Sequence, residues 1–182
     1  LTMLKTNCTP EEEQHINNIS KNLIDQRRKG TDAFGFLVAS EGNGTNIDNT
    51  GGALILLNSV WDSAALGIHH IFNGYVEWLV HTIDFLFNHT EQNIIIRQHP
   101  GEKLDYQKPN DDLKQLISEK FGNTPRINFI DCHANVNTYE LIEKANIILC
   151  FSSTSGIESA ILGKTVIVSS NCYYSTQSFV YK

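Results

Sequence analysis

Several motifs that mark a function on their own are missing from this sequence. It contains neither GxGxxG, the phosphate-binding turn of nicotinamide dehydrogenases, nor GxxxxGK[ST], the P-loop of nucleotide hydrolases. Its four cysteines form no CxxC pair and no closely spaced framework. This cysteine pattern favours reduced thiols in a cytosolic protein over a disulfide scaffold. The expected location is therefore the cytoplasm.

Basic clusters and long apolar runs are also scarce. The formal net charge is -6, and the scattered basic residues argue against a nucleic-acid partner. No apolar stretch reaches the length of a transmembrane helix, and no signal peptide opens the sequence. We expect an ordinary globular protein without a transmembrane segment, at most peripheral at the inner face of the plasma membrane.

Metal ligands do not form a recognisable set. The adjacent pairs His69-His70 and Cys132-His133 lack a third and fourth ligand at suitable spacing. We therefore expect no metal and no cofactor.

The 182 residues suit one domain plus an additional segment. A helix is predicted from the cap at Thr9 to a stop at Gly30, with Ile16, Ile19, Leu23 and Ile24 at helical spacing. A segment rich in Gly, Asn, Thr and Asp follows. We expect residues 1–52 to be a helix and linker left from a preceding lobe. Residues 53–182 then form the main domain, truncated at both ends.

The main domain alternates short apolar runs with amphipathic stretches. Strands are predicted at 53–57, 93–99, 126–130, 147–151 and 165–168, and helices at 75–87, 111–121, 138–145 and between the last two strands. This order is typical of an α/β fold with a doubly wound parallel sheet, as in a Rossmann-like domain.

The turn after the strand 147–151 consists of hydroxyl residues, Ser152, Ser153, Thr154 and Ser155. It precedes a short helix with an apolar stripe that ends at Gly163; the stripe comprises Ile157, Ala160, Ile161 and Leu162. A helix N-terminus at the carboxyl end of a parallel strand suits a phosphate, and hydroxyl donors would add to it. The alternative is that these residues only cap the helix.

Glu158 lies one turn into the same helix. Its negative charge would lie unfavourably close to a bound phosphate unless the side chain turns aside and accepts a hydrogen bond from a ribose hydroxyl. The alternative is a solvated acid in the first helical turn.

Arg97 and His99 are two positions apart in the strand 93–99, so their side chains are predicted to point to the same face of the sheet. Together they would suit an anion at the end of the strand, where Pro100 stops it. The alternative for His99 is a surface loop. Asp62 also follows a strand and could act as a base, a nucleophile or a hydrogen-bond acceptor. Its alternative role is a helix or turn cap.

Four stretches together resemble the capsule polysaccharide biosynthesis glycosyltransferases of bacteria, and the likeness runs from about Leu54 to Tyr174. They are the segments 97–100 (RQHP), 137–145 (NTYELIEKA), 151–158 (FSSTSGIE) and 163–167 (GKTVI). The resemblance implies the nucleotide-binding, C-terminal half of a GT-B enzyme. Relatives with the His-Pro motif use CMP-activated acidic sugars such as Kdo or sialic acid.

The resemblance also implies residue roles and partners. His99, Pro100, Ser152, Ser153 and Thr154 would hold the CMP. His99 and Arg97 would stabilise the leaving phosphate, or His99 would protonate it. Asp62 ends a motif that usually begins with Gln, where this chain has Asn58. The partners would be a nucleotide-sugar donor, a glycan or glycolipid acceptor and other capsule assembly proteins.

Three other functions remain open. A CDP-glycerol glycerophosphotransferase has a similar fold and an Arg-x-His-Pro stretch, but it tends to carry an acidic residue and Tyr where this chain has Cys150-Phe151. A UDP-sugar epimerase can share the fold. A non-catalytic nucleotide-binding or glycan-binding module is the alternative from a different class.

Overall fold

The computed structural model describes residues 8–32, 51–59, 71–104 and 112–182. Asp62, the His69-His70 pair and most of the predicted linker lie outside these ranges. The division at residue 52 therefore stays a prediction.

A five-stranded parallel sheet forms the centre of the molecule. Its strands are β1 (Ala53–Leu56), β2 (Ile94–Arg97), β3 (Ile127–Ile130), β4 (Ile147–Cys150) and β5 (Thr165–Val168). Their spatial order is β3-β2-β1-β4-β5, with every neighbouring pair parallel. β1 and β2 are buried along their whole length, as their continuous apolar runs predict. The predicted doubly wound α/β fold is confirmed.

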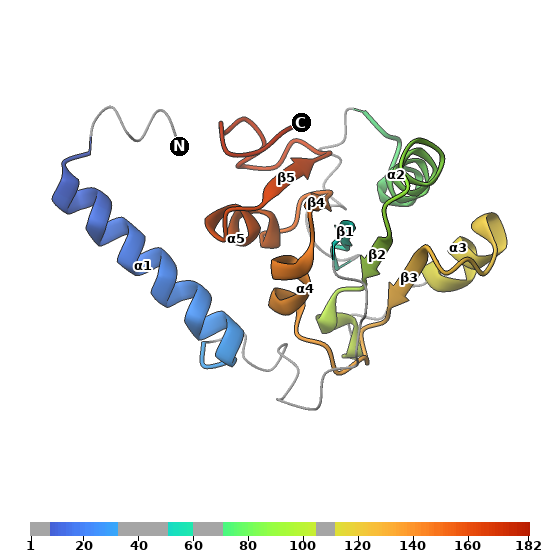
Figure 1. Cartoon of the computed structure of the whole chain (residues 1–182), viewed down its shortest axis with the longest axis horizontal. Coiled ribbons are helices and arrows are strands. Elements are labelled where there is room, and N and C mark those ends of the chain that lie inside the picture. Colours follow the sequence, from blue (N-terminus) through green and yellow to red (C-terminus); the bar gives the residue numbers. More distant parts are fainter. Residues whose placement is uncertain (1–7, 33–50, 60–70, 105–111) are drawn as a thin grey trace.

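Helices cover both faces of the sheet (Figure 1). One face packs against α2 (Tyr75–His89) and α3 (Leu113–Phe121) through a core that includes Trp78, Ile83 and Ile117. The other face packs against α4 (Thr138–Lys144) and the seven-residue α5 (Ser155–Ile161). Two helical layers around one parallel sheet leave the carboxyl edge of the strands as the place for a ligand.

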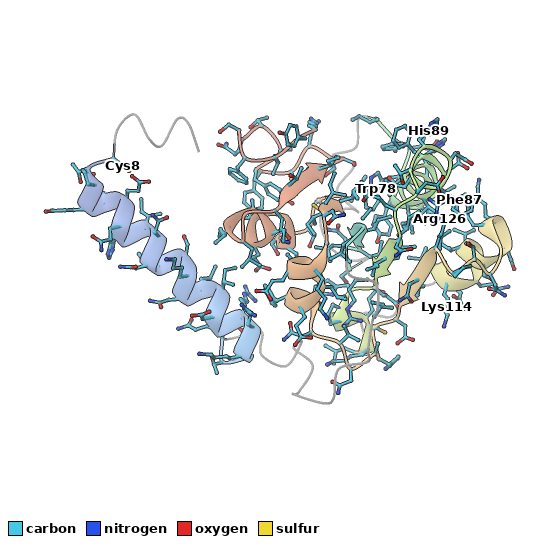
Figure 2. All side chains as sticks on the ribbon, in the orientation of Figure 1. Cys8, Trp78, Phe87, His89, Lys114 and Arg126 are labelled. Atoms are coloured by element: carbon cyan, nitrogen blue, oxygen red, sulfur yellow. The ribbon has the colours of Figure 1, made fainter. Side chains whose placement is uncertain are left out.

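Arg126, the residue before β3, binds the carboxyl end of α2. Figure 2 shows this side chain beside Phe87, and the guanidinium carbon lies 4.7 Å from the ring centroid. Its Nη1 also donates to the Phe87 carbonyl oxygen at 3.1 Å. A cation bound to the last carbonyls of a helix stabilises the helix end.

The long helix α1 (Pro10–Lys29) is capped as predicted. Thr9 and Glu12 form a capping box, and Gly30 adopts a left-handed φ of 63° at the other end. The predicted apolar face is nevertheless mostly outside the core, because only Ile24 is buried while Ile16, Ile19 and Leu23 remain 44–54 % exposed. Figure 1 shows why: α1 points away from the sheet, and only its last turns approach α4 and α5.

Two further expectations need correction. β2 ends at Arg97, and Pro100 begins a four-residue 3-10 helix, η3 (Pro100–Lys103), so strand alternation does not extend to His99. Ile161 of the predicted α5 stripe is 39 % exposed, while Glu158 and Ser159 are buried instead. The outer edge of β5 is partly paired, since Tyr181 exchanges two backbone hydrogen bonds of 2.8 Å with Val166 and Val168.

In the part of the chain that the structure describes, no helix has the length and hydrophobicity needed to cross a membrane. The cytoplasmic location stays a prediction.

Candidate functional site at the carboxyl edge of the sheet

The strand register brings five residues to the same level at the carboxyl edge of the sheet. Leu56 pairs with Arg97 and with Cys150, which in turn pair with Ile130 and Val168. We call the residues two positions beyond these strand ends the row at the carboxyl edge; in the order of the sheet they are Cys132, His99, Asn58, Ser152 and Ser170. The chain reverses its winding between β1 and β4, so this row spans the topological switch point, where open α/β sheets bind ligands.

Asn58 and Ser152 are joined directly across this switch point. Asn58 Nδ2 donates to Ser152 Oγ at 2.9 Å, and the Ser152 backbone N–H donates to Asn58 Oδ1 at 3.3 Å. Both side chains are buried, at 2 % and 5 % exposure. Because Ser152 Oγ accepts from Asn58, its own proton is directed elsewhere. In the sequence, Asn58 stands out only because it is the first residue of a motif that usually begins with Gln. The sequence alone does not show its hydrogen bonds with Ser152.

Ser153 supports the turn that leads into α5. Its Oγ accepts from the Ser155 N–H at 3.3 Å, and its carbonyl oxygen accepts from Gly156 N–H at 3.0 Å and from the Tyr174 hydroxyl. Thr154 is the N-cap residue, but its side chain makes no capping bond. The Ser153 side chain therefore has the predicted alternative role of capping the helix, and the Thr154 side chain does not.

Tyr174 is a part of the site that the sequence reasoning missed. Its ring is 2 % exposed, and its hydroxyl contacts Cys150 Sγ at 3.5 Å as well as the Ser153 carbonyl. Burial raises the phenol pKa well above its ordinary value, so the group stays a protonated donor beneath the turn. An aromatic residue in the last turns of the chain carries no signal for this contact.

His99 follows β2 and caps η3. Its Nδ1 accepts from the Gly101 backbone N–H at 3.1 Å, and the side chain is partly exposed. A neutral imidazole that accepts at Nδ1 carries its proton on Nε2. His99 therefore presents an N–H donor at Nε2, while Pro100 begins η3 and sets the direction of the exit.

Arg97 turns toward the segment between β3 and α4. Its guanidinium donates to the carbonyl oxygens of Asp131 and Val136 and to Thr138 Oγ1, the last two at 3.4 Å. The residue is 3 % exposed, and burial lowers its pKa from the ordinary value. These contacts give Arg97 a structural role in holding the loop. Its predicted contact with a donor phosphate remains a prediction.

Glu158 faces the opposite side of α5 from solvent. It is 8 % exposed, accepts from the Tyr139 hydroxyl at 2.9 Å and lies 3.6 Å from Arg27 Nε. The solvated alternative is therefore wrong. Burial, and secondarily the Glu158 charge, raises the pKa of Tyr139, which keeps it a donor. The predicted ribose contact of Glu158 stays a prediction.

The described ranges bring together no group of three His, Cys, Asp or Glu side chains suited to a metal ion. All four cysteines are free thiols. Asp62, the predicted catalytic carboxylate, lies outside the described residues.

Comparison with known proteins gives a family match. Residues 40–180 match the family model described as "Capsule polysaccharide biosynthesis protein". No curated protein sequence matches the chain.

Two solved structures resemble the fold. The Thermosulfurimonas dismutans KpsC beta Kdo 2,4 transferase is 17 % identical with a TM-score of 0.59, covering 95 % of this chain and 49 % of its own. The beta Kdo 2,7 transferase of the same organism's KpsC is 14 % identical with a TM-score of 0.54, covering 97 % of this chain and 47 % of its own. This chain thus spans about half of either structure.

Proposed function

Because the chain belongs to the family of capsule polysaccharide biosynthesis proteins, we propose that it is the nucleotide-binding half of a GT-B glycosyltransferase. The reaction would transfer a sugar from a nucleotide donor to a growing capsule or surface glycan. Two structural neighbours named as Kdo transferases support this reading through their fold. The acceptor site and its base would come from a second half of the enzyme.

The observation that carries the proposal is the row of polar groups at the switch point. His99 lies at the exit of β2, held by the Gly101 N–H, and Ser152 lies at the end of β4, held by Asn58. Donors fixed before the ligand arrives stabilise negative charge without reorganising in the transition state. Sugar transfer from a nucleoside monophosphate donor develops such charge on a single phosphate. A CMP-linked acidic sugar, as in Kdo or sialic acid transfer, fits this requirement.

Calorimetric titration with CMP, CDP, UDP and ADP at matched salt tests the donor class. We expect CMP to bind selectively, and His99→Ala to reduce its affinity about tenfold by removing a hydrogen bond to charged phosphate. Ser153→Ala should weaken binding by about 0.5 to 1.5 kcal/mol, the value of one hydrogen bond. His15→Ala, on the exposed part of α1, is the control.

Other outcomes separate the alternatives. A preference for CDP would favour a glycerophosphotransferase, and a preference for UDP would favour an epimerase or a UDP-sugar enzyme. Binding of CMP that is equal in wild type and His99→Ala would remove this edge as the donor site. No binding by a folded sample would overturn the proposal for this chain.

A further inference from the structure

Glu102 is a buried carboxylate three residues after His99. Only 2 % of its surface is exposed, and it is among the largest fully buried side chains in the described ranges. Burying a carboxylate is unfavourable unless hydrogen bonds compensate for the lost hydration. Its burial also keeps it from touching an acceptor sugar, so any functional effect must act through neighbouring residues.

Gln98 connects this carboxylate to the sheet edge. Its Nε2 donates to Glu102 Oε2 at 2.7 Å, while its Oε1 accepts from the Cys132 backbone N–H at 3.0 Å. Cys132 belongs to the row of residues at the carboxyl edge. The Glu102 backbone N–H also donates to the His99 carbonyl oxygen at 3.0 Å. Glu102 is thus attached to the exits of both β2 and β3.

This attachment determines where η3 lies. A four-residue 3-10 helix has little stability of its own, because its hydrogen bonds are few and poorly aligned. Within it, the Gly101 N–H must point at His99 Nδ1 for the 3.1 Å hydrogen bond to form. The same hydrogen bond leaves the imidazole proton on Nε2.

We propose that Glu102 is a positioning residue. Its hydrogen bond with Gln98 holds η3 in place, so that Gly101 keeps His99 in the Nε2–H tautomer, aimed as a donor at an anionic oxygen. The identity of that oxygen, a nucleotide phosphate, rests on the proposed function. The effect on the His99 tautomer does not.

Three variants separate positioning from simple stability. Glu102→Met has similar size and removes the hydrogen bond, whereas Glu102→Gln keeps an acceptor for Gln98. The matched control is Glu119→Met, because Glu119 accepts from Gln115 at 2.7 Å with the same four-residue spacing on the exposed surface of α3. Circular dichroism and thermal unfolding identify the folded samples.

The primary measurement is two-bond ¹H–¹⁵N correlation NMR of the full chain, at a pH where imidazoles are neutral, with the His99 signals assigned through His99→Gln. We expect the Nε2–H pattern in wild type, Glu102→Gln and Glu119→Met, and a mixture of both tautomers in Glu102→Met. A wild-type proton on Nδ1, or an unchanged tautomer in folded Glu102→Met, would overturn the proposal. Should Glu102→Met fail to fold, Glu102→Gln must keep the tautomer, and its loss there would overturn the proposal equally.

CMP titration of the same variants gives the functional readout. Glu102→Met should weaken CMP binding about tenfold, as for loss of an oriented hydrogen bond to phosphate, and Glu102→Gln should restore it. If wild type does not bind CMP while Glu102→Met still changes the tautomer, the proposed function fails and the positioning role stands. If wild type binds CMP while folded Glu102→Met keeps both the wild-type tautomer and the wild-type affinity, the positioning role fails and the proposed function stands.

Discussion

Asn58 and Ser152, which are 94 residues apart in the sequence, hold each other through two hydrogen bonds at the topological switch point between β1 and β4. The pair closes the gap between the ends of β1 and β4 and fixes the Ser152 backbone as well as its hydroxyl. The candidate site therefore depends on a residue that belongs to neither the His-Pro motif nor the hydroxyl-rich turn.

Asn58→Ala should destabilise the protein and weaken nucleotide binding together. The substitution leaves a buried backbone N–H and a buried hydroxyl without their partner, which costs about 1 to 3 kcal/mol in unfolding free energy. Urea denaturation and CMP titration measure the two effects. Asn73→Ala, where the amide donates to Glu77 on the surface, should change neither by a comparable amount. Full stability in Asn58→Ala would show that the pair is not needed.

Arg97→Lys should lower stability even without nucleotide. A lysine ammonium cannot reproduce the planar set of donors that reaches Asp131, Val136 and Thr138. We expect a loss of about 2 to 4 kcal/mol from broken hydrogen bonds to a buried charged group. Denaturation of the unliganded protein measures it. A variant with wild-type stability but weaker CMP binding would instead support the predicted phosphate contact.

Gly156→Ala should be destabilising because the space beside this residue is already filled. An added Cβ would lie 2.9 Å from Cys150 Sγ and well inside contact distance of the Tyr174 hydroxyl. Overpacking of this kind costs about 1 to 3 kcal/mol. Tyr174→Phe removes the obstructing oxygen, so the double variant should lose less unfolding free energy than the two single variants lose in total. Strict additivity in the four-protein cycle would contradict this packing.

Glu158→Gln separates a structural role from ribose binding. The substitution weakens the contacts with Tyr139 and Arg27, so we expect lower stability by about 1 to 2 kcal/mol for altered buried hydrogen bonds. Tyr139→Phe should produce a similar loss, because it removes the donor from the same bond. Denaturation and CMP titration distinguish the roles: weaker nucleotide binding at unchanged stability would favour the ribose contact.

Stability should fall in alkaline solution because of Cys150. Burial raises the pKa of this thiol from 9.0 to about 12. Above pH 9 the unfolded chain therefore loses this proton while the folded chain keeps it, and unfolding becomes more favourable as the pH rises toward 12. Between pH 9 and pH 10, Cys150 should lower the free energy of unfolding by about 1 kcal/mol. Cys150→Ala should show a shallower decline in this interval, whereas Cys8→Ala, outside the core, should keep the wild-type slope.

The sequence could predict most of the elements because each carries a local signal. The apolar runs of β1 and β4, the cap at Thr9 and the left-handed Gly30 and Gly163 all lie where the pattern placed them. The boundary at His99 was wrong because Pro100 can start a 3-10 helix as readily as it ends a strand. Ile16 and Ile19 show the limit of periodicity, since helical spacing cannot tell whether anything covers the apolar face.

The sequence by itself determined the doubly wound order and the placement of His99 and Ser152 after strands, since these follow from local periodicity and turn chemistry. Only the tertiary structure decided which side chains meet there. Asn58 reaches Ser152, Tyr174 reaches Ser153, and Arg97 turns to the β3–α4 segment because strand register and helix packing bring together residues that are distant along the chain. A polar residue's partner depends on which strands are neighbours, and no local pattern of residues contains that information.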